Sequence, residues 1–373
     1  MTPDPTDLQT FERTLRSMDG TLATGGPAPS EVAAVARELV ADGRGILAAD
    51  ESIGTLDKRL AQVGAEPSAV CRRRYRQWLV TAPGLGRHVS GVILYDETIR
   101  QATGDGTPFP AAVTAAGMAP GIKVDTGTAA LAGHPGEQVT SGLDGLRDRL
   151  AEYRTLGARF AKWRAVVSVG DDHPSRACLR ANAQVMARYA GLCHEAGIVP
   201  VVEPEVLMDG DHGLGANRVV TAAALAHTFA ALADLDVAID AVLVKVNMVL
   251  PGEGSAEDPD DEEVAAATLG VLRNTIPAAV PGVVFLSGGQ SPLAATRRLN
   301  AINELAVADP HGPAPWRLSF SYARALQGPA LAAWDGAEGN VEAAQRLLVQ
   351  RARCTSAAAT GCWDPALEDA APQ

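Results

Sequence analysis

The lysines of this chain are few, and their types and positions suggest chemistry. Of its 32 Lys and Arg residues, only Lys58, Lys123, Lys162 and Lys245 are Lys. Because Arg serves wherever a positive charge is needed, we expect a retained Lys to do what a guanidinium cannot. An ε-amine can lose its proton in a suitable environment and attack a carbonyl carbon, whereas a guanidinium stays protonated. The lysines are therefore candidates for carbonyl chemistry.

Three of the lysines lie within short apolar runs. Lys123 lies in GIKVD, Lys162 in FAKWR and Lys245 in VLVKVNMV. Runs of this composition predict buried strands. An ammonium is costly to bury unless it is paired or neutralised, so we expect these three side chains to meet polar partners inside the protein.

Eight strand-like runs recur along the chain, with Ala-rich amphipathic stretches between them. Their starts are roughly 30 to 45 residues apart, which fits one strand and one helix per unit and predicts a single-domain α/β fold, a (β/α)8 TIM barrel. An open doubly wound sheet is the alternative, but it needs a G-x-G-x-x-G turn where this chain has GILAADESIG. The runs begin at Gly45, Val89, Gly121, Arg159, Val199, Ala241, Gly282 and Arg317.

The candidate catalytic residues lie at the ends of these runs. Active sites of such barrels lie at the C-terminal mouth, and residues two apart share one face of a strand. Neighbouring cations lower the pKa of a lysine, so Lys162 and Arg164 are candidates to activate Lys245, with carboxylates moving protons. The side chains expected to meet at the barrel axis are Asp50, Lys162, Arg164, Glu203, Glu205, Lys245 and Asn247.

A second group predicts a phosphate site. Ser287, Gly288 and Gly289 end the seventh run, and Arg324 follows the eighth. Backbone N–H groups of a Gly-rich turn can approach an anion closely, and an Arg can grip it as a fork. The loops after strands seven and eight often bind phosphate in this fold.

The strings GILAADES, GIKVD, FAKWR, VEPE, VKVNMV, FLSGGQS and SFSYARAL together resemble class I fructose-bisphosphate aldolase. The resemblance extends from about Ala41 to about Gly361. It implies that Lys245 forms the Schiff base and that Glu203 is the general acid/base. It further implies that Asp50 and Glu205 orient protons and hydroxyls, and that Lys162 assists carbinolamine formation.

The resemblance also implies where the substrate's phosphates bind. Arg164 is a further candidate for substrate binding, and Lys58 falls beside Arg59 at the rim. One phosphate is expected at Ser287, Gly288, Gly289, Ser321 and Arg324, and the other towards Ser52, Thr55, Arg59 and Lys123.

The activity so implied is the reversible cleavage of D-fructose 1,6-bisphosphate to dihydroxyacetone phosphate and D-glyceraldehyde 3-phosphate, in glycolysis and gluconeogenesis, by a homotetramer without cofactor or metal. One alternative is a Schiff-base aldolase for another phosphorylated ketose, such as sedoheptulose 1,7-bisphosphate or fructose 1-phosphate. A metal-dependent aldolase is disfavoured because the seven His form no H-x-H pair. A non-catalytic scaffold is disfavoured because Lys245, Glu203, Asp50 and Lys162 are all present.

The sequence departs from the family in three places. Val246 stands where the family usually has Pro, and Ala323 where it usually has Gly. The C-terminal Tyr of the animal enzymes has no counterpart, since the last tyrosine is Tyr322. We therefore expect water, a carboxylate or the substrate phosphate to protonate the enamine.

The composition of the chain argues against several other classes of function. The net charge of −12 argues against nucleic acid as a partner, and no apolar stretch approaches the roughly 20 residues that span a membrane. No signal peptide is recognisable, and five scattered Cys indicate reduced thiols, so we expect a cytoplasmic protein. The acidic run from Glu257 to Glu263 is interpreted as a loop leading into a helix. We expect an N-terminal extension over 1–28, the barrel over 29–361 and a short tail over 362–373.

Overall fold

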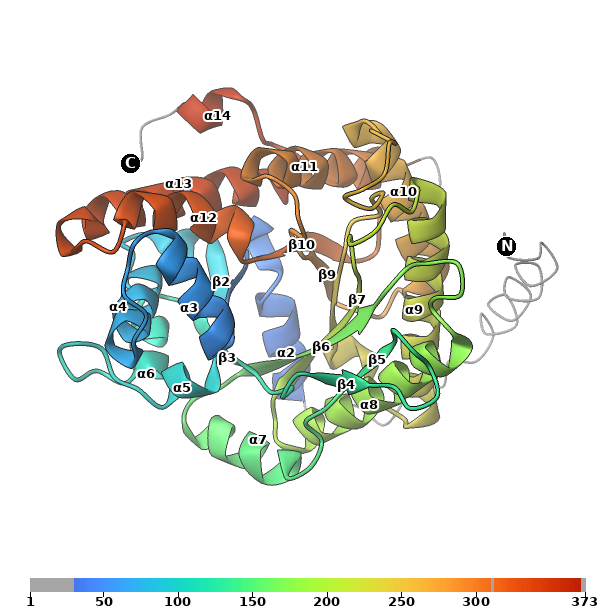
Figure 1. The fold of residues 1–373 in the computed structure, drawn as a ribbon, viewed down its shortest axis with the longest axis horizontal. Helices are drawn as coiled ribbons and strands as arrows, with labels where there is room; N and C mark the ends of the chain where they lie inside the picture. Colours follow the sequence, from blue (N-terminus) through green and yellow to red (C-terminus); the bar gives the residue numbers. More distant parts are fainter. Residues whose placement is uncertain (1–29, 310–311, 370–373) are drawn as a thin grey trace.

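The computed structural model describes residues 30–309 and 312–369. At its centre, eight parallel strands close into a barrel in the order β1-β10-β9-β8-β7-β6-β3-β2 (Figure 1). Each of the eight predicted runs forms one of these strands, so the predicted fold class is confirmed. The strands are β1 Gly45–Ala49, β2 Val89–Leu94, β3 Ala119–Lys123, β6 Phe160–Val167, β7 Val199–Val206, β8 Leu243–Val246, β9 Gly282–Phe285 and β10 Arg317–Tyr322.

Helices surround the barrel (Figure 1). The longer ones are α3 Ile53–Gln62, α4 Ala69–Val80, α7 Leu146–Thr155, α8 Arg176–Glu195, α9 Leu214–Asp234, α10 Asp261–Thr275, α11 Pro292–Ala308, α12 Arg324–Trp334 and α13 Val341–Ala358. The shorter ones are α2 Ser30–Glu38, α5 Asp96–Ile99, α6 Phe109–Ala115 and α14 Ala366–Asp369, with 3-10 turns at Ala41–Gly43, Leu85–Arg87, Ile239–Ala241 and Glu338–Asn340. A small antiparallel pair, β4 Thr128–Ala130 and β5 Gln138–Thr140, was not predicted.

The acidic run before α10 caps two helices. Asp260 and Glu263 form a reciprocal capping box at the start of α10, and Glu257 Oε2 accepts a hydrogen bond of 2.7 Å from the Leu214 N–H at the start of α9. Carboxylates at these positions satisfy N–H groups that the helix leaves free and complement the helix dipole. The interpretation of the run as a loop leading into a helix is thus confirmed.

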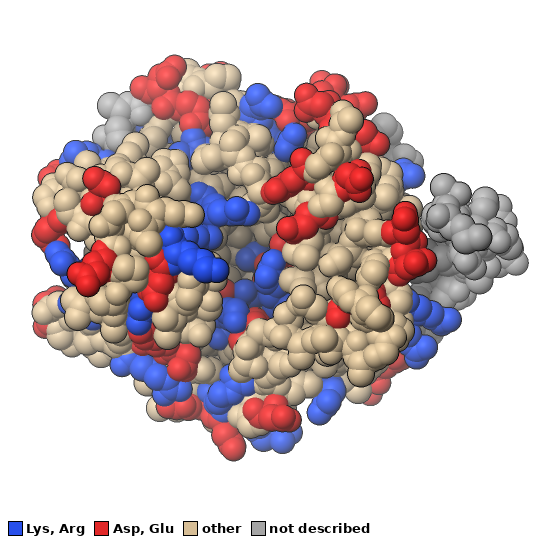
Figure 2. Space-filling view, in the orientation of Figure 1, with Lys and Arg blue, Asp and Glu red and all other residues tan. Residues whose placement is uncertain are grey.

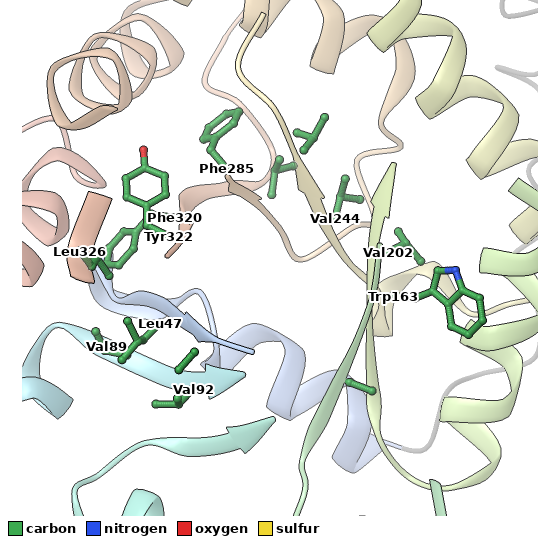
Figure 3. Packing of buried hydrophobic residues seen from close by; sticks show 14 of the residues in the cluster. Leu47, Val89, Val92, Trp163, Val202, Val244, Phe285, Phe320, Tyr322 and Leu326 are labelled. Atoms are coloured by element: carbon green, nitrogen blue, oxygen red, sulfur yellow. The ribbon is translucent and has the colours of Figure 1, made fainter. Parts of the chain in front are cut away.

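Alternation along the strands separates two hydrophobic layers. The residues that point outward pack against the helices, as Figure 3 shows for Val202, Val244 and Trp163. The Trp163 ring lies 5.5 Å from that of Tyr189 on α8, centre to centre. Because neighbours on a strand face opposite ways, the residues beside Val202, Val244 and Trp163 must point into the barrel.

The lower part of the barrel interior is filled with apolar side chains. Phe160 lies at its centre, and a Cβ on Gly121 or Gly91 would stand only 2.3 or 2.8 Å from its ring, so both strands need Gly where they pass it. Helix α2 packs across the same end, contributing Ala36 and Leu39 to the cluster. The inward residues of this layer are Ile46, Ala48, Ile93, Phe160, Val199, Val201, Leu243 and Val284, each at most 2% exposed.

Two expectations concern the ends of the chain. The proposed extension over 1–28 lies outside the described residues. Part of the proposed tail is described: Glu368 in α14 pairs with Arg351 of α13 and accepts a 2.9 Å hydrogen bond from the Trp363 indole. None of the described helices is long and apolar enough to cross a membrane.

Candidate active site

Four of the predicted catalytic residues meet in one ion-pair cluster inside the barrel. Lys245 Nζ lies 2.9 Å from Glu203 Oε1. Lys162 Nζ lies 2.8 Å from Asp50 Oδ2 and 3.3 Å from Glu203 Oε2. All three strand residues are at most 5% exposed. Lys162, Glu203 and Lys245 continue the inward alternation of Phe160, Val201 and Leu243, so the strand period itself places them above the apolar layer.

The two carboxylates of the cluster are held in their charged form. Burial would raise the pKa of Asp50, but the charges of Lys162 and Lys245 outweigh it and lower the pKa to about 2. Burial opposes ionisation of Glu203 as well, yet Lys162, Lys245 and Arg164 hold its pKa below the ordinary value. The pKa of Lys162 is raised, because attraction to Asp50 and Glu203 exceeds the effect of burial. Lys162 is therefore a cation that stays protonated between two carboxylates.

One oxygen of Glu203 remains available to a ligand. Glu203 Oε2 is buried and accepts no hydrogen bond from any described residue; its contact with Lys162 is an ion pair of 3.3 Å. A buried carboxylate oxygen without a hydrogen-bond donor carries a desolvation cost. A substrate hydroxyl would supply that donor.

The Asp50 ion pair predicts a specific loss of stability in acid. Because the folded-state pKa of Asp50 is about 2 against an ordinary 3.8, its contribution is complete above about pH 4 and is lost as the pH falls towards 2. The contribution is on the order of 2 kcal/mol. We expect the urea midpoint of Asp50→Asn to be lower at pH 7 and to fall less between pH 4 and 2 than that of the unmodified chain. Equal falls in the two proteins would show that Asp50 is not an ionic partner of Lys162.

The remaining charged residues of the barrel form separate pairs. Arg164 pairs with Glu205 at 2.5 Å, and burial, which would lower the pKa of Arg164, is outweighed by that contact, so the pKa is raised. Lys123 pairs with Asp125, at 2.7 Å to Oδ1 and 2.9 Å to the backbone carbonyl. Asp125 is buried and also accepts a hydrogen bond from the Arg164 N–H. The structure thus places Arg164, Glu205 and Lys123 beside the four-residue cluster, each with a partner of its own.

The expectation for Asn247 is wrong. Its side chain accepts a 3.1 Å hydrogen bond from the Val206 N–H and donates to Thr221 and Asn217 of α9. Strand β8 ends at Val246, so the alternation that brings Lys245 to the axis does not extend to Asn247. The amide ties β7 and α9 together behind the nucleophile.

The predicted phosphate turn is assembled. Arg324, at the first residue of α12, donates a 2.5 Å hydrogen bond to the Gly288 carbonyl. Gly288 has φ +53°, a left-handed conformation that glycine adopts without strain. Ser321 faces inward on β10, and its buried Oγ has no hydrogen-bond partner in the described residues. Ser287 is also buried, so the structure brings together the residues expected at one phosphate.

The residues expected at the other phosphate lie at the start of α3. Ser52 is the N-cap, and its Oγ lies 3.0 Å from Thr55 Oγ1. Arg59 is held by Glu51 at 2.5 Å, and Lys58 beside it is exposed. Lys123 is joined to Asp125 and has no ion pair or hydrogen bond with the α3 side chains among the described residues.

Two carboxylates of the site were missed by the sequence interpretation. Glu51 is buried, pairs with Arg59, and its carbonyl accepts from the fully buried Arg76 at 2.5 Å. Asp125 holds Lys123. Both lie inside the quoted strings GILAADES and GIKVD, and the signal that could have found Asp125 is an acid two residues after a lysine in a buried run.

Two of the departures from the family, and the last tyrosine of the chain, have definite places. Val246 is buried and faces the helices, and its carbonyl accepts from the Leu286 N–H. Ala323 precedes α12 and accepts the N–H groups of Leu326 and Gln327. Tyr322 is fully buried, with its hydroxyl donating 3.0 Å to the Ala295 carbonyl. Tyr322 is thus held in the wall of the barrel, as expected.

The hollow at the centre of the molecule carries basic side chains although the chain as a whole is acidic. Figure 2 shows Lys and Arg side chains on the left of this hollow, and positive charge in a concave site attracts anionic ligands. No group of three His, Cys, Asp or Glu side chains that could hold a metal ion occurs in the described ranges.

Comparisons with known proteins agree with this geometry. A family model described as "Fructose-bisphosphate aldolase class-I" matches residues 31–373. A Xylella fastidiosa protein named "Probable fructose-bisphosphate aldolase class 1" is 50% identical over 334 residues, covering 89% of this chain and 98% of the relative. Fructose-bisphosphate aldolase 2 of Caenorhabditis elegans is 47% identical and is covered over 91% of both chains.

A solved structure shows the same arrangement. The fructose-bisphosphate aldolase of Plasmodium falciparum, solved with TRAP and a small-molecule inhibitor, superposes with a TM-score of 0.88 at 41% identity, covering 91% of this chain and 98% of that one. A family match over nearly the whole barrel, together with relatives of about half-identical sequence, leaves one assignment: this chain belongs to the class I fructose-bisphosphate aldolase family.

Proposed function

We propose that the protein cleaves D-fructose 1,6-bisphosphate reversibly into dihydroxyacetone phosphate and D-glyceraldehyde 3-phosphate through a Schiff base on Lys245. The observation that carries the proposal is the buried contact of Lys245 Nζ with Glu203 Oε1. It combines an amine nucleophile with a group that can take its proton, which is the arrangement that nucleophilic catalysis requires.

The first half of the reaction builds an electron sink. Lys245 gives a proton to Glu203 and attacks the C2 ketone, forming a carbinolamine. One proton from the nitrogen and the proton held by Glu203 pass to the developing oxygen, which leaves as water, while Lys162, held as a cation, donates a hydrogen bond to it. The product is a protonated imine between Nζ and C2, and C2 is bonded to C3 of the C3–C4 bond that must break.

The second half breaks the carbon–carbon bond. The proton of the C4 hydroxyl passes to a carboxylate of the Asp50–Glu203 pair, C4 becomes the aldehyde carbon, and the C3–C4 electrons move into the imine to give an enamine. Glu203 Oε2, which accepts no hydrogen bond from the described residues, supports this role. A proton then returns to C3, and water releases dihydroxyacetone phosphate from Lys245.

The two phosphates align the open-chain sugar across the mouth. We assign one to the turn of Ser287, Gly288 and Gly289 with Arg324 and the unpartnered Ser321 Oγ. Hydroxyl-bearing and basic residues at the rim bind the other, and holding both ends converts their binding energy into positioning of the reacting bond. Those residues are Ser52, Thr55, Arg59, Lys123 and Arg164, with Glu205 orienting Arg164.

A substrate profile tests the proposal. The purified chain should cleave fructose 1,6-bisphosphate with a kcat/KM at least about tenfold above those for fructose 1-phosphate and sedoheptulose 1,7-bisphosphate, because tenfold corresponds to about 1.4 kcal/mol of transition-state binding. Activity should survive dialysis against EDTA. A preference for another ketose would keep the mechanism and change the substrate, whereas loss on chelation would reject the metal-free mechanism.

Further proposals concern the whole protein. We infer a homotetramer, a cytoplasmic location and domain limits of 1–28, 29–361 and 362–373. A relative from Arabidopsis thaliana, 48% identical, is named as cytosolic, which supports the proposed location. The mass of the purified protein in solution tests the oligomeric state.

A further inference from the structure

Two loops meet beside the phosphate turn. The backbone N–H groups of residues 252–254 donate in order to the carbonyls of His212, Met208 and Gly210, at 2.8, 2.7 and 2.8 Å. The contact is close, because a Cβ on Gly252 would stand 2.3 Å from the Gly210 carbonyl oxygen. The loop after β8 is therefore fixed to the loop after β7, and the backbone of Glu253 has a defined position.

That position brings two side chains against the turn. A Cβ on Gly289 would stand 2.1 Å from Glu253 Oε1, and a Cβ on Gly288 would stand 2.8 Å from Met208 Sδ. A carboxylate oxygen thus occupies the space beside the Gly289 Cα. This oxygen therefore lies beside the backbone that an anion bound at the turn would approach.

The charge of Glu253 has no partner at the turn. No ion pair or hydrogen bond joins its carboxylate to another of the described residues, and the side chain is exposed. Figure 2 shows acidic side chains on the upper right of the central hollow, across from Lys and Arg on its left. A negative group beside an anion site raises the free energy of the bound anion without touching the reacting carbons.

We propose that Glu253 is a specificity-determining residue that weakens the binding of phosphate at the Ser287–Gly289 turn by charge repulsion. The inference rests on the proposed function, which assigns that turn to a substrate phosphate. Glu253 stands in the approach to the turn, so a dianionic ligand meets more repulsion than a monoanionic one, and an uncharged end meets none. The residue thereby favours release of the phosphorylated product from this end.

Charge repulsion determines how much Glu253 should change the phosphate affinity and how that change should depend on salt concentration. Between exposed groups a few ångström apart, a carboxylate and a phosphate dianion repel enough to change an affinity roughly three- to tenfold. The Debye length falls from about 10 Å at 0.1 M salt to about 3 Å at 1 M, so the effect should nearly disappear in concentrated salt. A contribution from the shape of the Glu253 side chain to the phosphate affinity would persist in concentrated salt.

Inhibition by inorganic phosphate provides the test. Inorganic phosphate should compete with fructose 1,6-bisphosphate, and its inhibition constant should fall roughly three- to tenfold in Glu253→Gln at low salt. Gln keeps the size of the side chain, so the space beside Gly289 stays filled. Glu262→Gln, an exposed change in the first turn of α10, is the matched control and should leave the constant unchanged. Arg324→Gln removes the cation of the same turn and should raise the constant.

The outcomes separate this inference from the proposed function. Inhibition constants within twofold for Glu253→Gln and the unmodified chain, with Arg324→Gln weakened, would overturn the role of Glu253 and leave the phosphate site in place. A change that persists undiminished in concentrated salt would also overturn it, since repulsion would not be the cause. If Arg324→Gln had no effect either, the turn would not be the phosphate site, and the proposal would fail at its foundation.

Discussion

Sodium borohydride added with dihydroxyacetone phosphate should inactivate the protein and leave the reduced adduct on Lys245. The amine is the nucleophile closest to Glu203, at 2.9 Å, and only an amine forms an imine that hydride can reduce. Peptide mapping by mass spectrometry checks the site of the label. Adduct on Lys162 or Lys123, or no adduct, would contradict the mechanism.

Lys245→Arg tests whether position 245 needs only a positive charge or needs a nucleophilic amine. The substitution keeps a cation beside Glu203 but removes the group that can lose a proton and attack a carbonyl. We expect kcat to fall by at least about 1,000-fold, or about 4 kcal/mol, and trapping to disappear. The control is Lys58→Arg, because Lys58 is exposed at the rim and should lose far less activity. Near-normal turnover of Lys245→Arg would refute the inference from lysine usage.

Lys162→Arg should lower kcat by at least about a hundredfold, the scale of losing a general acid. Lys162 Nζ fits between Asp50 and Glu203 at 2.8 and 3.3 Å, and a planar guanidinium cannot take that place without displacing one of them. Borohydride should still label Lys245 in this variant, but more slowly, because the loss falls on carbinolamine dehydration rather than on the nucleophile. Rapid-quench trapping measures that step.

Arg164→Lys, the opposite exchange on strand β6, is the control for Lys162→Arg. Arg164 pairs with Glu205, and its side chain is 40% exposed. Arg164→Lys keeps a charge at a place where a charge suffices, so we expect mainly a rise in KM, roughly tenfold or less. Equal losses of kcat in Lys162→Arg and Arg164→Lys would show that the strand has simply been disturbed.

The period-two alternation of the strands predicted which residues form the cluster better than it predicted which side chains each residue contacts. Alternation from Phe160 to Lys162 and from Val201 to Glu203 follows from backbone geometry, so sequence spacing could locate the cluster. It failed at Asn247, because β8 stops one residue earlier and the side chain found partners on α9. Alternation is a property of a strand and carries no information past its end.

Partners that come from distant parts of the chain could not be predicted. Glu257 reaches the start of α9, 43 residues away, and Arg76 reaches the Glu51 carbonyl across 25 residues. Spacing along the sequence does not encode such contacts, since they depend on how the helices pack around the barrel. For the same reason the sequence predicted the strands of the barrel but neither the β4–β5 pair nor the position of α2 beneath the barrel.

The apolar layer around Phe160 closes one end of the barrel within the described residues. Ile46, Val199, Leu243 and Val284 pack beneath the lysines, and α2 lies across the lower end, so substrate is expected to reach the cluster from the mouth. Substrate and products therefore enter and leave through the same end of the barrel. Because the proposed substrate lies across that opening, both triose products leave by the same end of the barrel, and the covalent bond to Lys245, rather than a second exit, decides which of them leaves last.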